Sequence, residues 1–372
     1  MENKISIGII GGGINSAVGY AHFSAINLSN KFVIKAGCFS RNAEKNNESA
    51  QIYNVDRDRL YIDYRHMLNA EKSKIDAVVI LTPTNQHIEQ ILYAIKLGIP
   101  VICEKSLTIN YTDILKIKEL SDKRFCSVVF NYICYPMLKE LRNIINNKKL
   151  GKINQIQIEM PQEGFLRLKN DLPVTPQNWR LVDGTIPTIS LDIGTHVYSI
   201  VKFLTNEIPL EAIAIQNNFG NFDGVVDDVN AIVKYSNDVI CNMWYSKSAL
   251  GNRNGLRVRI YGTNGSAEWY QNEPEYLILS DNNGMVQKID RSSTECNIAN
   301  QLKYNRFKVG HPSGFIEALA NFYEDVYNDL FAFINNKTIN KETFGIKESE
   351  ECIRLLEAIS LSSKYNKWIK IK

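Results

Sequence analysis

The stretch Ile7-Gly8-Ile9-Ile10-Gly11-Gly12-Gly13-Ile14-Asn15-Ser16 decides the fold of the first part of this chain. A short apolar run that ends in three glycines is typical of a buried parallel strand entering a tight turn. The segment from Ala17 to Leu28 favours a helix, so the glycines fall where backbone N–H groups approach a pyrophosphate. The stretch therefore predicts a dinucleotide-binding loop formed by Gly11, Gly13, Ile14 and Asn15. Ser16 replaces the third glycine of G-x-G-x-x-G, and a bare glycine triplet is also compatible with a simple turn.

Strands and helices alternate after this loop. The expected strands span residues 32–39, 77–81, 101–103 and 126–130, and the expected helices span residues 42–53, 64–70, 87–97 and 113–120. This alternation is typical of a doubly wound parallel sheet. We therefore predict an α/β Rossmann domain that binds NAD(P) over residues 1–130.

The pattern changes near residue 150. Longer segments of alternating polarity at residues 153–160, 210–217, 229–235, 239–246 and 256–261 indicate a largely antiparallel open sheet. Helices expected over residues 189–204, 315–335 and 346–365 would cover this sheet. We assign residues 131–372 to a second, α+β domain for substrate binding and oligomerisation, whose last helix is free to pack back on the first domain.

The composition excludes several classes of function. The 372 residues are 44% apolar, which is enough for two cores, and 43 basic against 40 acidic side chains leave a net charge of only +3. The chain has no basic block interleaved with aromatics, so we expect no nucleic-acid partner. The first apolar run is too short for a leader or a membrane span, so we expect a cytoplasmic protein without a membrane partner. The seven cysteines form no C-x-x-C pair and the five histidines have no ligand spacing, so we expect no metal.

The end of the second expected strand bears on the choice of cofactor. An acidic residue there usually holds the ribose hydroxyls of NAD, but this chain has Phe39-Ser40-Arg41. A hydroxyl and a guanidinium suit a 2′-phosphate better than a carboxylate does. Ser40 and Arg41 therefore favour NADP over NAD. The alternative is that Arg41 is a solvated loop residue that tolerates either cofactor.

Six short motifs, in this order along nearly the whole chain, resemble those of one enzyme family. They are Gly11-Gly12-Gly13, the strand end Leu81-Thr82-Pro83-Thr84-Asn85-Gln86-His87, Cys103-Glu104-Lys105-Ser106, Phe130-Asn131-Tyr132, Asp192-Ile193-Gly194-Thr195-His196 and Gly310-His311-Pro312. Together they resemble the Gfo/Idh/MocA family, named for glucose-fructose oxidoreductase and inositol dehydrogenase, whose members oxidise or reduce sugar carbons with a nicotinamide. The subgroup that looks most similar contains the inositol and anhydrosugar dehydrogenases.

The resemblance implies roles for several of these residues. Thr82, Pro83, Asn85 and His87 would line the nicotinamide side of the cleft. Glu104 and Lys105 match the E-K-P of the family, with Ser106 in place of the proline, which loosens the turn that presents the lysine. Asp192, Thr195 and His196 match the signature on the helix that opens into the active site.

Hydride transfer from a secondary alcohol needs a base for the hydroxyl proton, and Lys105 and His196 are the two candidates. Asp192 and His196 are four residues apart on an expected helix, so the carboxylate is placed to fix the imidazole tautomer or to share a proton with Lys105. We expect Lys105 to orient and polarise the oxygen while His196 transfers the proton. The alternatives are a surface lysine, a core histidine and an Asp192 that only caps the helix.

Substrate contacts are expected from aromatic and charged side chains, because sugars present both apolar C–H faces and hydroxyls. The candidates are Tyr132, Trp179, Arg180 and His311, besides Lys105, Asp192, Thr195 and His196. Trp179 and Arg180 would otherwise pack a loop against the sheet, and His311 would cap the following helix.

The sequence thus favours an NAD(P)-dependent oxidoreductase acting on a CH–OH group of a sugar, anhydrosugar or cyclitol. The alternatives are a nucleotide-sugar dehydrogenase or biliverdin-reductase-like member of the same family, and a non-catalytic cofactor sensor. The sensor would keep the glycines but lose the lysine and histidine, and this chain has Lys105 and His196. A homodimer or homotetramer that associates through the open sheet is also expected.

Overall fold

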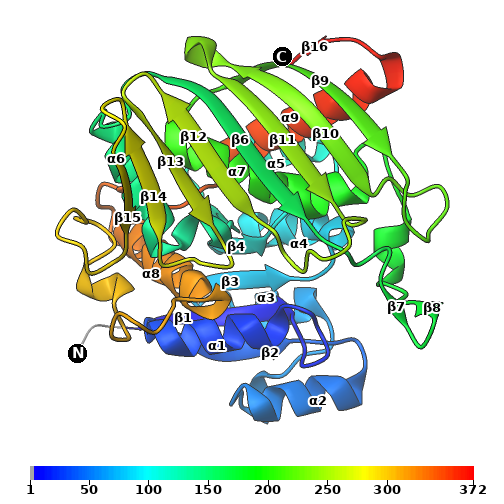
Figure 1. The fold of residues 1–372 in the computed structure, drawn as a ribbon. Coiled ribbons are helices and arrows are strands. Elements are labelled where there is room, and N and C mark those ends of the chain that lie inside the picture. The colour runs from blue at the N-terminus through cyan, green and yellow to red at the C-terminus, as the bar shows by residue number, and fades with distance from the viewer. Residues whose placement is uncertain (1–3) are drawn as a thin grey trace. The chain divides into compact units, whose positions relative to one another are not determined.

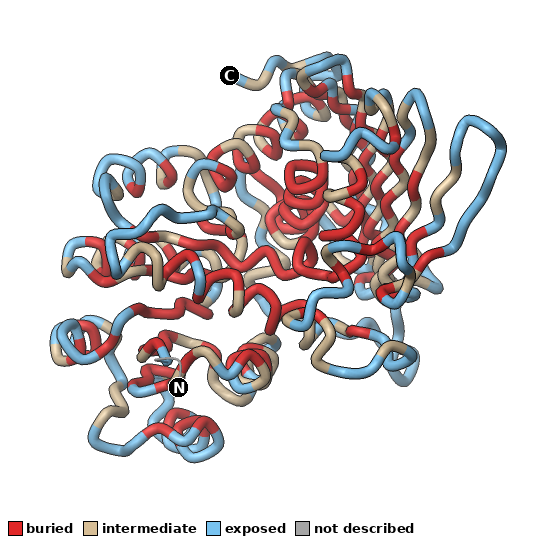
Figure 2. Tube along the Cα trace, turned by 90° about the vertical axis from the view of Figure 1, so that its left-hand side faces the viewer, coloured by how far each residue is buried: buried red, intermediate tan, exposed pale blue. Residues whose placement is uncertain are grey.

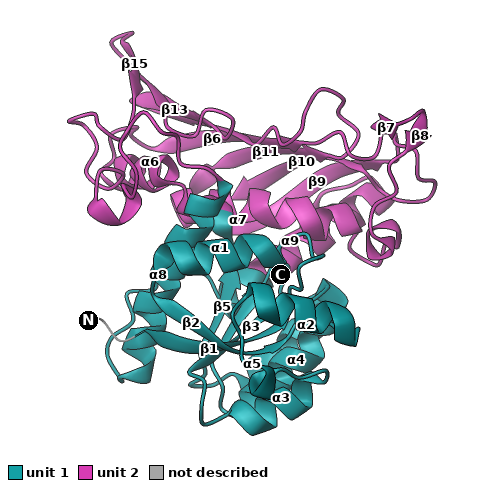
Figure 3. Cartoon of the chain, turned by 90° about the horizontal axis from the view of Figure 1, so that it is seen from below, with its two compact units in different colours: residues 1–131, 315–350 teal, residues 132–314, 351–372 magenta. Residues whose placement is uncertain are grey.

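The computed structural model describes residues 4–372, which form two compact units (Figure 3). The first unit holds the described residues up to Asn131 together with residues 315–350. The second holds residues 132–314 and 351–372. The division therefore differs from a single cut at residue 130, because one late segment of the chain belongs to the first unit.

The first unit is built on a five-stranded parallel sheet with the order β2-β1-β3-β4-β5. Its strands are β1 (Ile5–Gly11), β2 (Phe32–Cys38), β3 (Ala77–Leu81), β4 (Val101–Glu104) and β5 (Cys126–Val129). Its first five helices are α1 (Gly19–Ser29), α2 (Ala43–Ile52), α3 (Tyr64–Glu71), α4 (Thr84–Lys96) and α5 (Tyr111–Leu120). All five residues of β3 are buried, as a continuous apolar run in a parallel sheet requires. The predicted Rossmann-type parallel sheet is confirmed.

The late segment completes this first unit. Its helix α8 (Phe315–Ile334) packs against α1, and the Phe32 ring meets the Tyr323 ring edge-on at 5.5 Å between centroids. Further along, the carbonyl of Phe344 accepts the backbone N–H of Val128 at 2.9 Å, beside the edge strand β5. The apolar side of α8 thus covers the first core, although sequence analysis assigned this segment to the second domain.

The second unit contains a nine-stranded sheet with the order β15-β14-β13-β12-β6-β11-β10-β9-β16. Its strands are β6 (Ile153–Pro161), β9 (Pro209–Asn217), β10 (Asp228–Tyr235), β11 (Ile240–Ser246), β12 (Arg257–Gly262), β13 (Gly265–Tyr270), β14 (Leu277–Asp281), β15 (Val286–Ile289) and β16 (Ile369–Lys370). β6 and β11 pair in parallel and the other neighbours are antiparallel, which confirms the largely antiparallel sheet. A separate hairpin joins β7 (Leu168–Lys169) to β8 (Leu172–Pro173).

The large sheet has one covered face and one open face. Along β10 the side chains of Val229, Ala231 and Val233 are buried, whereas Asn230 and Ile232 alternate with them and are exposed. Helices α6 (Pro136–Asn146) and α7 (Thr195–Thr205) pack against the sheet, and the last helix α9 (Ile346–Tyr365) runs beside β9 (Figure 1). In each unit the buried positions follow the strands and the inner sides of the helices (Figure 2). Among residues 4–372, no helix combines the length and the apolar character that crossing a bilayer requires.

Candidate active site

The glycine loop lies at the switch point of the first sheet. β1 has β2 on one side and β3 on the other, and ligands bind such sheets beyond the carboxyl ends of the strands where the order reverses. Gly11 and Gly12 have φ angles of +77° and +67°, which glycine adopts without strain. A Cβ atom at Gly12 would lie 2.6 Å from the side chain of Leu81 on β3. Both glycines are therefore required by the backbone itself.

A different residue from the one expected completes the loop. Helix α1 begins at Gly19, because the Gly13 carbonyl accepts the Ser16 N–H at 2.7 Å and the Ser16 hydroxyl accepts the Val18 N–H at 3.3 Å. Ser16 is thus a turn residue. A Cβ atom at Gly19 would lie 2.0 Å from the Gly12 carbonyl oxygen, so Gly19 is the glycine that lets the helix approach the loop.

Helix α2 supports the loop from the side. Its Ser49 hydroxyl accepts the Ile14 N–H at 3.1 Å, and the hydroxyl of Tyr53, the residue that follows the helix, donates to the Gly12 carbonyl at 3.0 Å. The Ile14 amide is therefore held by α2, whereas Asn15 is exposed. The bare, close-packed glycine backbone at the switch point fits the phosphates of a dinucleotide.

The end of β2 is fixed by a buried amide. The Asn46 side-chain oxygen accepts the N–H groups of Phe39 and Ser40 at 2.8 Å and 3.1 Å. Ser40 and the exposed Arg41 follow this anchored strand end. They stand where the adenosine ribose of a dinucleotide lies in this fold.

The residues after β3 have two different surroundings. Pro83 and Asn85 are exposed at the start of α4, and the Thr82 hydroxyl donates to Gln90 at 2.7 Å. His87, in contrast, is completely buried, with its ring nitrogens 2.8 Å from the Thr82 carbonyl oxygen and 2.9 Å from the Ser106 carbonyl oxygen. Burial lowers the pKa of His87. The expectation that His87 faces the cofactor is corrected, because its ring links two backbone turns inside the unit.

Lys105 follows directly after β4 and is half-buried. Its N–H donates to the carboxylate Oε2 of the preceding residue, Glu104, at 2.9 Å. The other oxygen of Glu104 lies 2.8 Å from Nε2 of His22 on α1. The carboxylate is thus directed into the unit rather than toward a ligand.

In the second unit, Asp192 lies within a π-helical turn, Ser190–Gly194, that leads into α7. Such turns are rare and often occur at functional sites. Asp192 does not cap the helix, because its carboxylate accepts from Arg180 Nε at 3.1 Å and from Lys247 Nζ at 2.7 Å. One carboxylate oxygen, Oδ2, receives both cations.

Lys247 is a residue that the sequence analysis missed. It is buried, with 7% of its side chain exposed, and follows the end of β11, a strand that pairs in parallel with β6. Lys105 likewise follows directly after a strand that pairs in parallel, but the parallel pairing of β11 with β6 cannot be read from the sequence. Arg180 stacks its guanidinium over the Trp179 ring at 4.4 Å, so these two predicted residues do lie together.

His196 lies at the start of α7 with its ring edge-on to Tyr132, at 4.6 Å between ring centroids. The Tyr132 hydroxyl accepts from Asn254 Nδ2 at 2.9 Å, and burial raises the pKa of Tyr132 to about 12. Thr195 is 1% exposed and its hydroxyl donates to the Leu191 carbonyl at 3.0 Å. The expected substrate contact of Thr195 is therefore corrected to a role within the helix.

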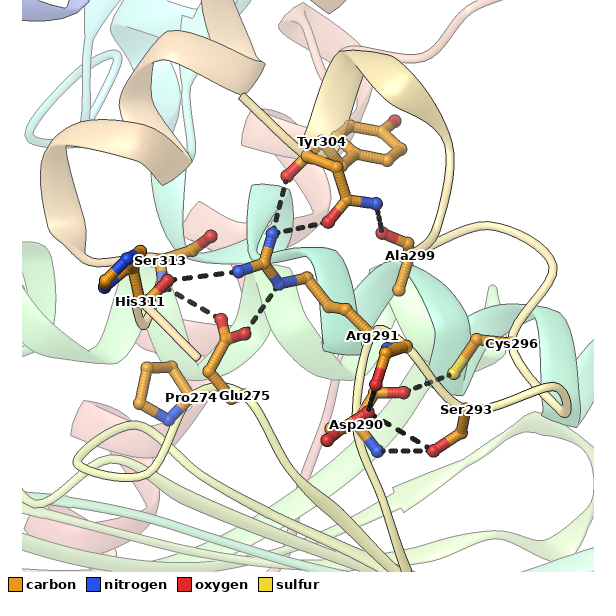
Figure 4. A network of polar contacts seen from close by, with 12 residues as sticks. Pro274, Glu275, Asp290, Arg291, Ser293, Cys296, Ala299, Tyr304, His311 and Ser313 are labelled. Carbon is orange, nitrogen blue, oxygen red and sulfur yellow. Dashed lines mark hydrogen bonds and ion pairs between the residues drawn. The ribbon is translucent and has the colours of Figure 1, made fainter. Parts of the chain in front are cut away.

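His311 is exposed on a loop that a buried ion pair anchors (Figure 4). Arg291, 1% exposed, donates to Glu275 at 2.6 Å and to the carbonyl of His311 at 3.2 Å. The second oxygen of Glu275 accepts the Ser313 N–H at 2.8 Å, so both sides of His311 are tied to this pair. The backbone at His311 is held while its side chain remains accessible.

Two family models match consecutive parts of the chain. Residues 5–132 match the oxidoreductase family with an NAD-binding Rossmann fold, and residues 138–268 match the GFO/IDH/MocA C-terminal domain. Together the two models cover most of the 372 residues.

Individual proteins are similar over most of their length. The uncharacterized oxidoreductase YfiI of Bacillus subtilis is 27% identical, with 93% of each chain covered. The levoglucosan dehydrogenase of Pseudarthrobacter phenanthrenivorans is 24% identical, with 72% of this chain and 73% of the relative covered. The fold is that of an inositol dehydrogenase homolog from Azotobacter vinelandii solved with NADH and myo-inositol, at a TM-score of 0.89 and 24% identity, with 100% of this chain and 98% of that chain covered. The chain therefore belongs to the Gfo/Idh/MocA family of oxidoreductases, with an NAD-binding Rossmann domain followed by the C-terminal domain of that family.

Proposed function

We propose that this chain is a dehydrogenase or reductase that transfers hydride between a nicotinamide cofactor and a secondary alcohol or ketone of a sugar, anhydrosugar or cyclitol. The observation that carries this proposal is the grouping around Asp192, where a carboxylate, Lys247 and Arg180 lie on or beside the turn that leads into His196. Polyol hydroxyls need acceptors as well as donors, and this group supplies both. The levoglucosan dehydrogenase and the myo-inositol-bound relative act on or bind polyols, which supports the same substrate class.

The roles of the residues follow from the chemistry of a CH–OH group. A bound nicotinamide would supply the acceptor or donor of the hydride. Lys105 orients and polarises the substrate oxygen, and His196 takes the hydroxyl proton in oxidation and returns it in reduction. Asp192, Tyr132, Trp179, Arg180 and His311 contact the remaining hydroxyls and C–H faces.

For the cofactor we propose NADP in preference to NAD. The glycine loop suits either, but Ser40 and Arg41 follow the anchored end of β2, where a carboxylate would select the free ribose hydroxyls of NAD. Arg41 is exposed and able to pair with a 2′-phosphate.

We also propose that copies of the chain associate through the open face of the large sheet. That face carries exposed apolar side chains, among them Ile215 and Ile232, and a groove of about 410 Å³ lined by Trp244 and Arg259. Exposed apolar groups on one sheet face are typical of a contact surface.

The seven cysteines are free thiols, which is consistent with a reducing compartment such as the cytoplasm.

One experiment tests the function and the cofactor together. Purified protein is titrated with NADH and NADPH by nicotinamide fluorescence, and cyclitols, mono-, anhydro- and nucleotide-sugars are then screened at the absorbance of the reduced cofactor. We expect tighter binding of NADPH and turnover of a cyclitol, sugar or anhydrosugar. Lys105→Ala and His196→Ala should each reduce turnover by about two to four orders of magnitude while leaving cofactor affinity nearly unchanged.

Other outcomes would change the proposed function or its catalytic residues. Turnover of nucleotide-sugars alone would move the chain to the nucleotide-sugar dehydrogenases. Binding without turnover of any compound would favour a cofactor sensor. Wild-type turnover in both alanine variants would exclude the proposed catalytic residues.

A further inference from the structure

His22 is a buried histidine held at both ring nitrogens, and it has no assigned role in catalysis. It lies on α1 with 1% of its surface exposed. Nδ1 is 2.7 Å from the hydroxyl of Tyr323 on α8, and Nε2 is 2.8 Å from Oε1 of Glu104 at the end of β4. Three segments that are distant in the sequence thus meet at one imidazole inside the first unit.

The chemistry of its two partners determines which ring nitrogen of His22 donates and which accepts. Burial, with the neighbouring charge of Glu104, raises the pKa of Tyr323 well above its usual range, so the phenol keeps its proton. The Glu104 carboxylate accepts hydrogen bonds. A neutral His22 ring is then satisfied when Nδ1 accepts from Tyr323 and the Nε2–H group donates to Glu104. The acceptor-only carboxylate of Glu104 thus requires the proton on Nε2, and the contact with Tyr323 at Nδ1 holds the ring in that orientation.

The second oxygen of Glu104 extends the chain of contacts to the proposed active site. Oε2 accepts the N–H of Lys105 at 2.9 Å, so the carboxylate is held at both oxygens. Only 14% of the Glu104 side chain is exposed, so protein contacts rather than solvent set its orientation. The imidazole of His22 is therefore connected through one carboxylate to the backbone that presents Lys105.

We propose that His22, oriented by Tyr323, is a positioning residue that holds the Glu104–Lys105 turn in the geometry that hydride transfer requires. The proposal rests on the role assigned to Lys105 above. Because α1 begins directly after the glycine loop, the same helix supports the cofactor-binding backbone and sets the place of the lysine. A small displacement of a reacting group is enough to reduce turnover strongly.

Two substitutions at His22 separate positioning from simple packing. The amide nitrogen of glutamine reaches the place of Nε2 and can donate to Glu104, whereas that of asparagine reaches only the place of Nδ1. We expect His22→Asn to lower kcat about ten- to a hundredfold and His22→Gln to recover most of this loss. Affinity for NADH and NADPH should stay within about twofold in both variants, because the glycine loop is unchanged. Equal kcat values in the two variants would overturn the proposal.

A measurement that does not depend on turnover keeps the inference separate from the proposed function. In protein whose lysines alone carry nitrogen-15, the backbone amide resonance of Lys105 is assigned by its loss in Lys105→Arg, and it reports the hydrogen bond to Glu104. It should shift in His22→Asn and remain close to the wild-type position in His22→Gln. Tyr323→Phe removes a single oxygen and should shift the same resonance and lower kcat severalfold. An unshifted resonance in both His22→Asn and Tyr323→Phe would refute the positioning role, whereas a wild-type protein that turns over no substrate would refute the proposed function instead.

Discussion

At the scale of single residues, the central feature is one carboxylate oxygen shared by two cations. Asp192 Oδ2 accepts from Lys247 at 2.7 Å and from Arg180 at 3.1 Å, and Lys247 is buried while Arg180 is partly accessible. Charge-assisted hydrogen bonds of this kind are short and directional. They hold Asp192 in one orientation, and Arg180 is the more accessible of its two cations.

Lys247→Met tests this arrangement because methionine keeps much of the side-chain volume but removes the charge. We expect kcat/KM for the substrate found in the screen to fall by about ten- to a hundredfold, since Asp192 loses its buried partner. Lys288→Met, at an exposed lysine paired with Glu273, is the matched control and should leave kcat/KM unchanged. Wild-type kcat/KM in Lys247→Met would mean that Asp192 needs only Arg180.

The residues of the site differ in how far the sequence could predict them. Gly11, Lys105 and Asp192 stand in short local motifs, so reading along the chain was sufficient to single them out. Lys247 lies 55 residues from its partner Asp192, and no local pattern joins the two. His87 stands in a motif and yet is buried, because the motif specifies a residue type without specifying where the side chain points.

At the scale of elements, the start of α1 determines the shape of the glycine loop. The helix begins at Gly19 rather than at Ala17, and its first residue touches the loop backbone. Hydrophobic periodicity locates long helices well, and α9 spans the predicted residues 346–365. It does not locate helix ends set by turns, nor the π-helical turn before α7, nor short strands such as β13 and β14. Helix α6 was not predicted from the sequence either.

Gly19→Ala should disturb the close contact between α1 and the glycine loop. The added Cβ atom would lie 2.0 Å from the Gly12 carbonyl oxygen, so either the helix or the loop must move. We expect the dissociation constant for NADPH to rise at least tenfold and stability to fall by about 1–3 kcal/mol, as is usual for an added methyl group in a packed site. Nicotinamide fluorescence and thermal unfolding measure the two effects.

Gly164→Ala is the control for this substitution, because a Cβ atom there meets nothing within 4 Å. It should leave cofactor binding at the wild-type value. Unchanged cofactor affinity in Gly19→Ala would show that the loop does not depend on the close approach of α1.

At the scale of the whole molecule, two separate segments of the chain form the first unit. Residues 315–350 return to pack on α1 and beside β5, and α9 then passes from the first unit into the second. The helices of this segment were predicted, but their place was not, because amphipathic patterns show that a face is buried without showing which partner buries it. The same limit applies to the open sheet face, whose partner we propose to be a second copy.

Ile232→Glu tests that association. Ile232 is 42% exposed on β10 and lines the groove of the open face. A charge there must be desolvated if the face is covered, so we expect the molar mass measured by light scattering to fall from that of a dimer or tetramer toward 42.4 kDa. Leu302→Glu, at a residue that is 91% exposed outside the sheet, should not change the molar mass. A wild-type protein that is monomeric at micromolar concentration would exclude the interface.

A loop in a binding site has to stay folded while its side chains change to bind new ligands. In the loop that carries His311, different residues meet these two demands. Its backbone is fixed by Arg291 and Glu275 from within, so folding does not depend on the exposed imidazole itself (Figure 4). Substitutions at this position therefore sample new ligand contacts on an unchanged scaffold. A library randomised at residue 311 alone would keep most of its members folded, which makes this loop the natural starting point for diversifying substrate preference.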